Sequence, residues 1–263
     1  MIGSAEDGRT AIIEKSVDKI ALFQTDSTQI ICSNHYQSDS FKTDKDNLNN
    51  IATSASDYRQ RRTQELLAQN TPLDYQKTAA ILRDRKGLNN AEIGMGNEKA
   101  INQLLGHHSV VFMPRKRLMW VSTAPYQLGA YVAYDLNEIF KNPKPEDKSL
   151  GIDTLLIAED SFAQHPDFKN YVEFRHLKKE LTKLSKDDSE YHKFDEEKAL
   201  RIVEINPNYF HAHELCGNFY KAKKRYGEAI VAYKNALEKE IATQAERDVI
   251  KANLEFCKVE NRK

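Results

Sequence analysis

Four residues whose side chains can take part in catalysis are adjacent in this chain: Cys32, Ser33, Asn34 and His35. They follow a β-branched run that ends at Ile31, so they occupy the end of a predicted strand. A cysteine thiolate is a nucleophile that a histidine can activate, and a side-chain amide can donate a hydrogen bond to a developing oxyanion. The group therefore suggests two kinds of chemistry, nucleophilic attack and oxyanion stabilisation.

A direct pairing of Cys32 with His35 is not expected, because side chains three positions apart across a strand end point to opposite faces. We interpret Cys32 as a small residue that faces the core. A stand-alone enzyme with Cys32 as its nucleophile is a further hypothesis, which unchanged activity in Cys32→Ala would eliminate. For Asn34 the residues leave two interpretations open, an oxyanion donor or an Asx-turn residue at the strand end.

A second group of polar residues marks the start of a predicted helix: Ser56, Arg59 and Arg62. Residues three apart share a helix face, so the two guanidinium groups lie together, with Ser56 one turn earlier near the N-cap. These side chains could hold a substrate carboxylate or brace the strand-end loop. The alternative is a helix face exposed to solvent.

The histidines are separate candidates. His107 and His108 directly precede a predicted strand, and adjacent side chains there point to opposite sides, so at most one faces any site. No further ligands lie near them at a suitable spacing, and we predict no metal site. We interpret His211 and His213, which lie in a predicted helix of the C-terminal region, as packing or surface residues.

A glycine-rich stretch, GMGNEKAINQ at residues 94–103, is the other candidate for a ligand site. It lacks the lysine pattern of a P-loop and follows no predicted strand, so it does not predict a nucleotide site. We expect no cofactor.

Composition limits the class of protein. The 263 residues include 39 Lys and Arg and 39 Asp and Glu, which argues against a nucleic-acid partner held by bulk charge. No apolar run approaches the roughly 20 residues of a membrane-spanning helix, and the polar N-terminus does not resemble a signal peptide. Three cysteines without a CxxC spacing fit a reducing compartment, with the cytoplasm as the default.

The first ~145 residues mix strand and helix patterns, estimated from their hydrophobic periodicity and turn residues. Without a regular alternation of strand and helix, they predict a mainly antiparallel sheet with helices packed on a face. We predict strands at residues 10–16, 19–24, 28–33, 109–114, 117–125 and 130–136, and helices at 54–69 and 73–87.

Residues 141–149, with two prolines and no apolar residue, predict a linker, and the patterns after it are helical. We therefore divide the chain into domains 1–145 and 146–263. Within about residues 195–240, small and aromatic residues occupy the positions of a tetratricopeptide repeat, although His213 replaces the usual Trp. These residues are Gly217, Tyr220, Ala229, Tyr233 and Ala236. Further helices are predicted at 171–186, 195–205 and 243–260.

Three motifs in residues 1–140 resemble the penicillin acyltransferase family, which comprises self-processing acyltransferases and amidohydrolases of the N-terminal-nucleophile superfamily. They are the triplet at residues 33–35, the Ser-x-x-Arg-x-x-Arg helix start at Ser56, and the strand pair GHHSVVFMPRKRLMWVS. The resemblance implies an α+β fold, a partial αββα sandwich, followed here by an all-α tetratricopeptide-like tail. It also implies that Asn34 contributes to the oxyanion hole, with Ser56 and Arg59 supporting the site or meeting substrate.

This sequence departs from the family in two places. Gly106 and His107 replace the Ser-Arg pair of penicillin-type members, so His107 becomes the candidate there and penicillin precursors are not the expected substrates. The family's nucleophilic cysteine, which self-cleavage makes N-terminal, has no counterpart upstream of Asn34. We therefore expect the C-terminal portion of such an enzyme, inactive alone, with the nucleophile on an upstream segment or another chain.

Two functions follow as expectations. The first is acyl transfer or hydrolysis at an amide or thioester of a small molecule, through an acyl-enzyme on the absent cysteine. The second is a non-catalytic interaction protein that binds a protein partner through its tetratricopeptide-like tail. An upstream coding region with a Gly-Cys-Thr/Ser stretch would favour the first.

Overall fold

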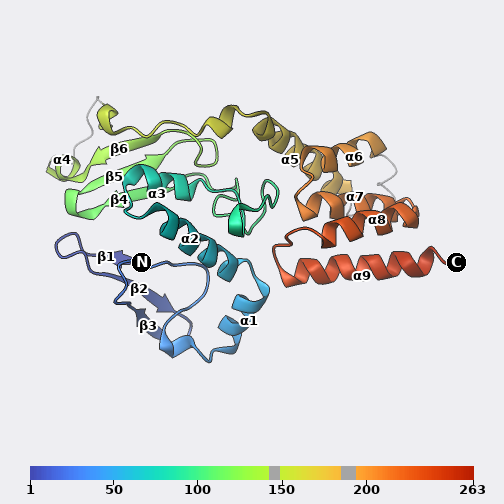
Figure 1. The fold of residues 1–263 in the computed structure, drawn as a ribbon, viewed down its shortest axis with the longest axis horizontal. Helices are drawn as coiled ribbons and strands as arrows, with labels where there is room; N and C mark the ends of the chain where they lie inside the picture. The colour runs from blue at the N-terminus through green and yellow to red at the C-terminus, as the bar shows by residue number, and fades with distance from the viewer. Residues whose placement is uncertain (142–148, 185–193) are drawn as a thin grey trace. The chain divides into compact units, whose positions relative to one another are not determined.

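The computed structural model describes residues 1–141, 149–184 and 194–263, which form two compact units (Figure 1). The first unit comprises Met1–Asp84 and Leu104–Ala163, and the second comprises Arg85–Gln103 and Gln164–Lys263. The predicted linker at residues 141–149 lies, apart from its two end residues, outside the described part of the chain. The division differs from a single boundary at 145, because the glycine-rich segment groups with the C-terminal helices.

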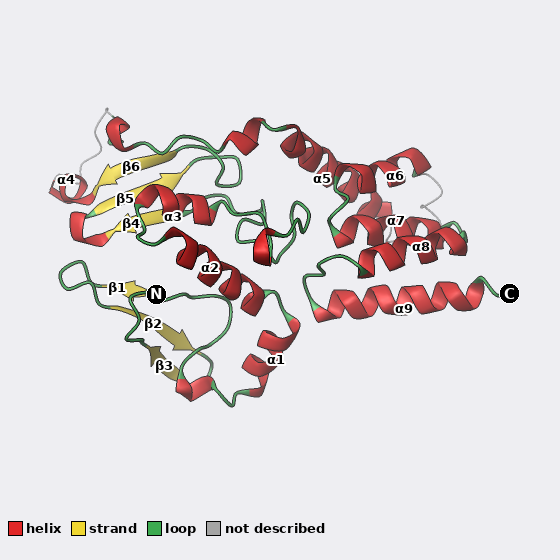
Figure 2. Ribbon diagram, viewed as in Figure 1, coloured by secondary structure: helices red, strands yellow, loops and turns green. Residues whose placement is uncertain are grey.

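The first unit contains two separate three-stranded antiparallel sheets in place of the single sheet that the sequence predicts (Figure 2). Each sheet follows the order of its strands in the chain, so each is a simple meander. The strands are β1 (Ile2–Gly3), β2 (Thr10–Lys15) and β3 (Ile20–Phe23) in one sheet, and β4 (Val110–Met113), β5 (Leu118–Ser122) and β6 (Tyr131–Asp135) in the other.

The predicted hairpin of β2 and β3 is confirmed, with Ile13 opposite Leu22. Side chains alternate across the sheet: Ile12 and Glu14 are buried, whereas Ile13 is exposed. The side chain of Ser16 accepts the backbone N–H of Lys19, which closes the turn between the strands. This hairpin fixes one wall of the candidate site described below.

The strand predicted at residues 28–33 is wrong, because this stretch belongs to no sheet of the structure. Its polar groups form hydrogen bonds with a side chain and with the start of a helix, and not with a neighbouring strand. The carbonyl of Ile31 accepts from Gln37 Nε2 at 2.7 Å, and the hydroxyl of Ser33 donates to the carbonyl of Ser56 at 2.8 Å. A β-branched run thus becomes an extended loop that lies across the start of a helix.

Three helices follow this loop, and their bounds are α1 (Lys45–Thr53), α2 (Ser56–Asn70) and α3 (Tyr75–Leu82). The sequence analysis missed α1, although Asp44 accepts the backbone N–H of Asn47 as an N-cap. Helix α2 begins where predicted, but its N-cap is Ala55, without a side-chain cap. Helix α3 ends five residues before Gly87, since Arg83 and Asp84 make tertiary contacts.

The second sheet and α3 enclose one hydrophobic core cluster of the first unit. Trp120 on β5 is fully buried, stacks on Tyr75 of α3 at 4.6 Å between ring centroids, and donates from Nε1 to the carbonyl of Leu155. Arg83 lies over the buried Tyr131 ring and donates to three consecutive carbonyls, those of residues 127–129. A short helix, α4 (Leu136–Lys141), follows β6.

The second unit is a helical array. Its helices are α5 (Pro166–Leu184), α6 (Glu196–Ile205), α7 (Phe210–Ala222), α8 (Tyr226–Leu237) and α9 (Gln244–Glu260). The packing expected of the repeat is present in α7 and α8. A Cβ added to Gly217 would lie 2.7 Å from the Tyr233 ring, so only glycine allows this approach of the two helices. His213 is buried, and its Nε2 bonds to the carbonyl of Pro207 at 2.8 Å.

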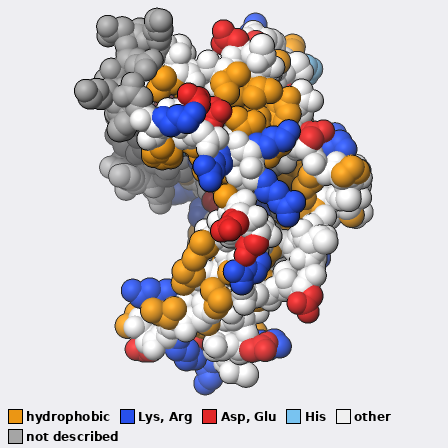
Figure 3. Space-filling view, turned by 90° about the vertical axis from the view of Figure 1, so that its left-hand side faces the viewer, with side chains coloured by type: hydrophobic (Ala, Val, Ile, Leu, Met, Phe, Trp, Pro, Cys, Tyr) orange, Lys and Arg blue, Asp and Glu red, His pale blue; other side chains and the backbone are white. Residues whose placement is uncertain are grey.

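No helix in the described residues is long and apolar enough to cross a membrane. On the face drawn in Figure 3, basic and acidic side chains are both present and are separated by hydrophobic and neutral ones. The fold is therefore mixed α and β, with small antiparallel sheets in the first unit and helices in the second.

Candidate functional site

The triplet at residues 33–35 lies against the first turn of α2, so two motifs that are 20 residues apart in sequence meet in space. Ser33 Oγ donates to the carbonyl of Ser56 at 2.8 Å, and the hydroxyls of the two serines are 3.1 Å apart. His35 Nδ1 lies 2.8 Å from Ser56 Oγ. Ser56 is 1% exposed, so it acts as a buried anchor for the loop rather than as a group open to substrate.

Asn34 is held by two polar residues. Nη2 of Arg59 donates to its side-chain oxygen Oδ1 at 2.6 Å, and Nδ2 of Asn50 donates to its backbone carbonyl at 2.5 Å. A guanidinium has donors only, so the amide atom that faces Arg59 must be the oxygen. The amide nitrogen of Asn34 therefore points away from Arg59, and it has no hydrogen-bond partner in the described part of the chain.

The triplet lines a polar cleft of about 790 Å³. The turn after β2 forms one side of this cleft, and the start of α1 forms another. Residues 12–18, residues 32–36, Asp44, Asp46, Asn47 and Asn50 line it. A volume of this size can hold a small-molecule substrate.

The wall behind the triplet is fixed by two buried polar side chains. Glu14 is 3% exposed, and its carboxylate accepts the backbone N–H groups of Gln37 and Ser38 at 2.5 and 3.0 Å. Asn47 bonds to both the N–H and the carbonyl of Tyr36, at 2.9 and 3.0 Å. A loop without a neighbouring strand thus obtains its hydrogen bonds from side chains.

His35 is half-buried beside Ser56. Burial lowers the pKa of its imidazole below the ordinary value of 6.5, and the charges of Asp57 and Glu14 act in the opposite direction. The imidazole is thus favoured in its neutral form near neutral pH, in which one ring nitrogen donates and the other accepts. This residue could relay or accept a proton at the cleft, and it also ties the loop to α2.

Cys32 lines the cleft with an exposed side chain, so its interpretation as a core-facing residue is wrong. The extended loop, unlike a strand in a sheet, has no buried side to receive it. Cys216 and Cys257 are the buried cysteines. Burial raises the pKa of the Cys216 thiol to about 11, which suppresses its thiolate.

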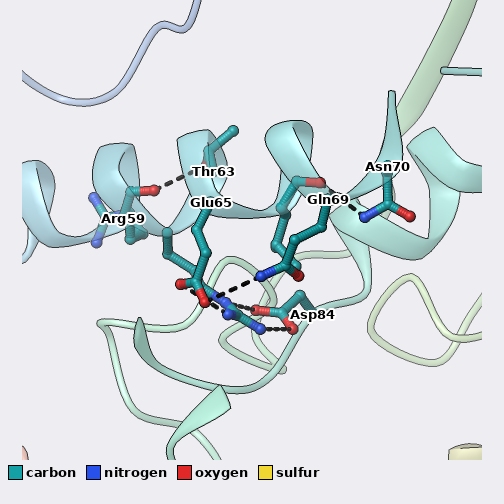
Figure 4. A network of polar contacts seen from close by, with 8 residues as sticks. Arg59, Thr63, Glu65, Gln69, Asn70 and Asp84 are labelled. Atoms are coloured by element: carbon teal, nitrogen blue, oxygen red, sulfur yellow. Dashed lines mark hydrogen bonds and ion pairs between the residues drawn. The ribbon is translucent and has the colours of Figure 1, made fainter. Parts of the chain in front are cut away.

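Arg62 is separate from the cleft and belongs to a buried ion-pair network. It is 1% exposed, binds both carboxylate oxygens of Asp84 at 2.9 Å, and also contacts Glu65 at 3.0 Å. Figure 4 shows the carboxylates of Glu65 and Asp84 directed toward the same point, and both form ion pairs with Arg62. The alternative of a solvent-exposed helix face is therefore wrong for Arg62, which joins α2 to the end of α3.

The predicted site residues thus divide into two sets. The structure brings together Asn34, Ser56 and Arg59, whereas His107 is exposed in the loop before β4 and does not line the cleft. His108 is likewise exposed. Among the described residues, no group of three or more His, Cys, Asp or Glu side chains is arranged to hold a metal ion.

Three residues of the site were not singled out from the sequence: Glu14, Asn47 and Asn50. Glu14 carried one signal, since a charged residue interrupts the apolar positions of the inward face of β2. The two asparagines follow the Asp44 cap, and identifying α1 would have placed them on successive turns of one helix.

Comparisons of the chain with protein-family models, with curated proteins and with solved structures found no match.

Proposed function

We propose that the first unit carries the oxyanion-binding part of an acyl-transfer site of the penicillin acyltransferase type. The reaction is transfer or hydrolysis at an amide or thioester of a small molecule. Asn34 donates its amide N–H to the developing oxyanion, and Arg59 is the positioning residue behind it. The attacking cysteine is contributed by another segment or chain.

The observation that carries the proposal is the orientation of the Asn34 amide. Its oxygen is bound to Arg59, its backbone carbonyl is bound to Asn50, and its nitrogen is left to donate at the wall of a cleft. An oxyanion donor has to be oriented before the reaction, because the advantage over water comes from not reorganising in the transition state. In an Asx-turn, by contrast, the side-chain oxygen would accept a hydrogen bond from a nearby backbone N–H.

The exposed outer face of the first sheet is evidence that a further segment or chain packs there. Ile13, Ile20 and Leu22 project from one face of the β2–β3 hairpin and are 50, 71 and 54% exposed. Apolar side chains in such a row are covered in stable proteins by another layer. A segment or chain that brings the nucleophile would bury this face as the next layer of a sandwich.

The experiment is hydrolysis of butyryl-p-nitroanilide by the purified chain, alone and co-expressed with an upstream coding region that supplies a Gly-Cys-Thr/Ser stretch. We expect no release of p-nitroaniline by the chain alone and release by the pair. In the pair, Asn34→Ala should lower kcat by about 10²–10³-fold, the usual loss for one oxyanion donor.

Asn49→Ala is the matched control, since Asn49 is an exposed asparagine of the same unit that does not line the cleft. It should leave kcat unchanged. Hydrolysis by the wild-type chain alone, or an active pair whose rate is insensitive to Asn34→Ala, would contradict the proposal.

The second candidate is a non-catalytic interaction protein. It is favoured by α9, on which Val249, Phe256 and Val259 are each at least half exposed at helical spacing, opposite the buried Ile250 and Leu254. A row of exposed apolar side chains on one helix face is typical of a surface that binds a partner. Loss of a partner from affinity purification with Phe256→Ser, without any acyl-transfer activity in the pair above, would favour this candidate.

A further inference from the structure

The glycine-rich segment, which has no role in the proposed function, is bound to one edge of the helical array. We propose that this edge is a peptide-binding site whose ligand is residues 93–99 of the same chain. The loop edge, as we call it, consists of Asn206 and Tyr209 in the connection from α6 to α7, and Glu240 in the connection from α8 to α9. All of these residues belong to the second unit.

Close approach of the two backbones is the first sign of a dedicated site. A Cβ at Gly94 would lie 2.4 Å from the Cα of Tyr209, and Gly94 has a φ of +84°. Gly96 has a φ of +86°, and a Cβ there would lie 3.0 Å from the ring of Tyr171 on α5. Only glycine adopts these angles at this separation without strain, so both glycines serve the contact with the array.

Asn206 binds the backbone of the residue between the two glycines. Its Oδ1 accepts the N–H of Met95 at 3.0 Å, and its Nδ2 donates to the carbonyl of Met95 at 2.9 Å. Asn206 is 2% exposed. One buried side-chain amide thus satisfies both backbone polar groups of one residue, as a neighbouring strand does in peptide recognition by sheets.

Side chains of the segment add specificity. Asn97 is fully buried and donates from Nδ2 to the carbonyl of Glu240 at 2.8 Å. Nζ of Lys99 lies 2.6 Å from the carboxylate of the same Glu240. Ile93, at the start of the segment, is 1% exposed. The loop edge therefore recognises a Gly-x-Gly backbone, an amide and a cation in a fixed order.

Covalent connection explains why this ligand would exclude others. A tethered ligand acts at an effective concentration of the order of millimolar, so a free peptide competes only when the internal one is weakened. The array then anchors a loop of its own chain, and the loop edge is open to an external peptide only after this loop leaves. This role is independent of the acyl-transfer proposal.

The first test is hydrogen exchange of the full chain, read at the amides of residues 93–99. They should exchange slowly in the wild type and at least tenfold faster in Asn206→Ala. Asn253→Ala is the matched control, because Asn253 is a hydrogen-bonded asparagine of the array whose partners, Lys221 and Asn218, are not in the segment. Equal exchange in wild type and Asn206→Ala would overturn the proposal.

The second test asks whether the site accepts the peptide from outside. A fluorescein-labelled peptide of residues 91–103 should bind the Gly94→Ala chain at least tenfold more tightly than the wild-type chain, measured by fluorescence anisotropy. The same peptide with alanine at position 94 should bind neither chain. Lys99→Glu, which replaces the ion pair with Glu240 by two like charges, should give a smaller gain in peptide binding and serves if Gly94→Ala unfolds the array.

The outcomes are distinguishable. Binding of the peptide that depends on its glycine supports the site. Equal binding of the two peptides would overturn the proposal. So would a Lys99→Glu chain in which the amides of residues 93–99 exchange faster but which does not bind the peptide.

Discussion

The guanidinium of Arg59 donates to Oδ1 of Asn34 at 2.6 Å, and this contact fixes the direction of the Asn34 amide. The two residues come from different motifs, one at the end of an extended loop and one in the first turn of α2. Ser56 ties the same loop to the helix through Ser33 and His35. The helix start thus sets both the position of Asn34 and the orientation of its donor.

The buried ion pair of Arg62 and Asp84 predicts a large stability effect. Asp84→Ala removes a bidentate partner and leaves a guanidinium that is 1% exposed, so the free energy of unfolding should fall by about 3–5 kcal/mol. Urea denaturation measures this change. Glu138→Ala, which breaks the exposed pair with Lys141, should change it by less than about 1 kcal/mol. A similar effect of the two substitutions would refute the role of the network.

The packing of Gly217 against Tyr233 predicts opposite effects of alanine at two helical glycines. Gly217→Ala should destabilise the array by about 1–3 kcal/mol, because its Cβ would lie 2.7 Å from the ring. Gly227→Ala, in α8, should be neutral or stabilise by about 0.5–1 kcal/mol, because its Cβ would lie at an ordinary contact distance of 3.8 Å from Asn261 Oδ1. Thermal melts followed by helical circular dichroism compare them, and equal melting temperatures would argue against close packing of α7 on α8.

The three cysteines should differ in reactivity. Cys32 is exposed, whereas Cys216 and Cys257 are buried, and burial raises the pKa of both buried thiols. Titration of the native chain with Ellman's reagent at pH 8 should therefore show one fast thiol, and three in urea. Cys32→Ala should remove the fast phase. Three fast thiols in the native chain would contradict the burial of Cys216 and Cys257.

Two histidines, the half-buried His35 and the buried His213, predict a loss of stability in mild acid. Burial lowers the pKa of His35 and of His213 from 6.5, so the unfolded chain binds protons more readily than the folded one. The contribution of the two neutral imidazoles to the free energy of unfolding is complete above about pH 6.5. It is lost as the pH falls from there toward the lower pKa values of the two histidines in the folded chain. The urea midpoint should therefore fall between pH 7.5 and 5.5, and less steeply in His213→Gln. An unchanged slope in that variant would contradict the account for His213.

Local periodicity predicted much of the secondary structure. The β2–β3 hairpin, the three strands of the second sheet, α2 and the helices of the array all follow from patterns within a few residues. The repeat positions also included Gly217 and Tyr233, which the structure shows to lie close together between α7 and α8. These features depend on residues that are close together in the sequence, so the sequence alone is enough to predict them.

Features that depend on distant partners were missed. Residues 28–33 have the composition of a strand, yet their hydrogen bonds go to Gln37 and Ser56, which lie outside the run. The exposure of Cys32 follows from the same error. Residues 94–103 were considered only as a nucleotide loop, because a contact between Gly94 and Tyr209 spans more than 100 positions. The site candidates Asn34, Ser56 and Arg59 came from the family resemblance and from helical spacing, whereas their hydrogen bonds required the structure.

The most direct test of the central claim observes the Asn34 amide itself. The side-chain ¹⁵N–¹H signals of Asn34, assigned by their absence in Asn34→Asp, are followed by NMR while butyrate is added to the full chain as a carboxylate probe of the oxyanion site. We expect a saturable shift of these signals in the wild type and a weaker one in Arg59→Leu, in which the amide is free to rotate. Signals of Asn34 that do not move with butyrate, or that move equally in Arg59→Leu, would contradict the claim that Arg59 orients Asn34 as an oxyanion donor.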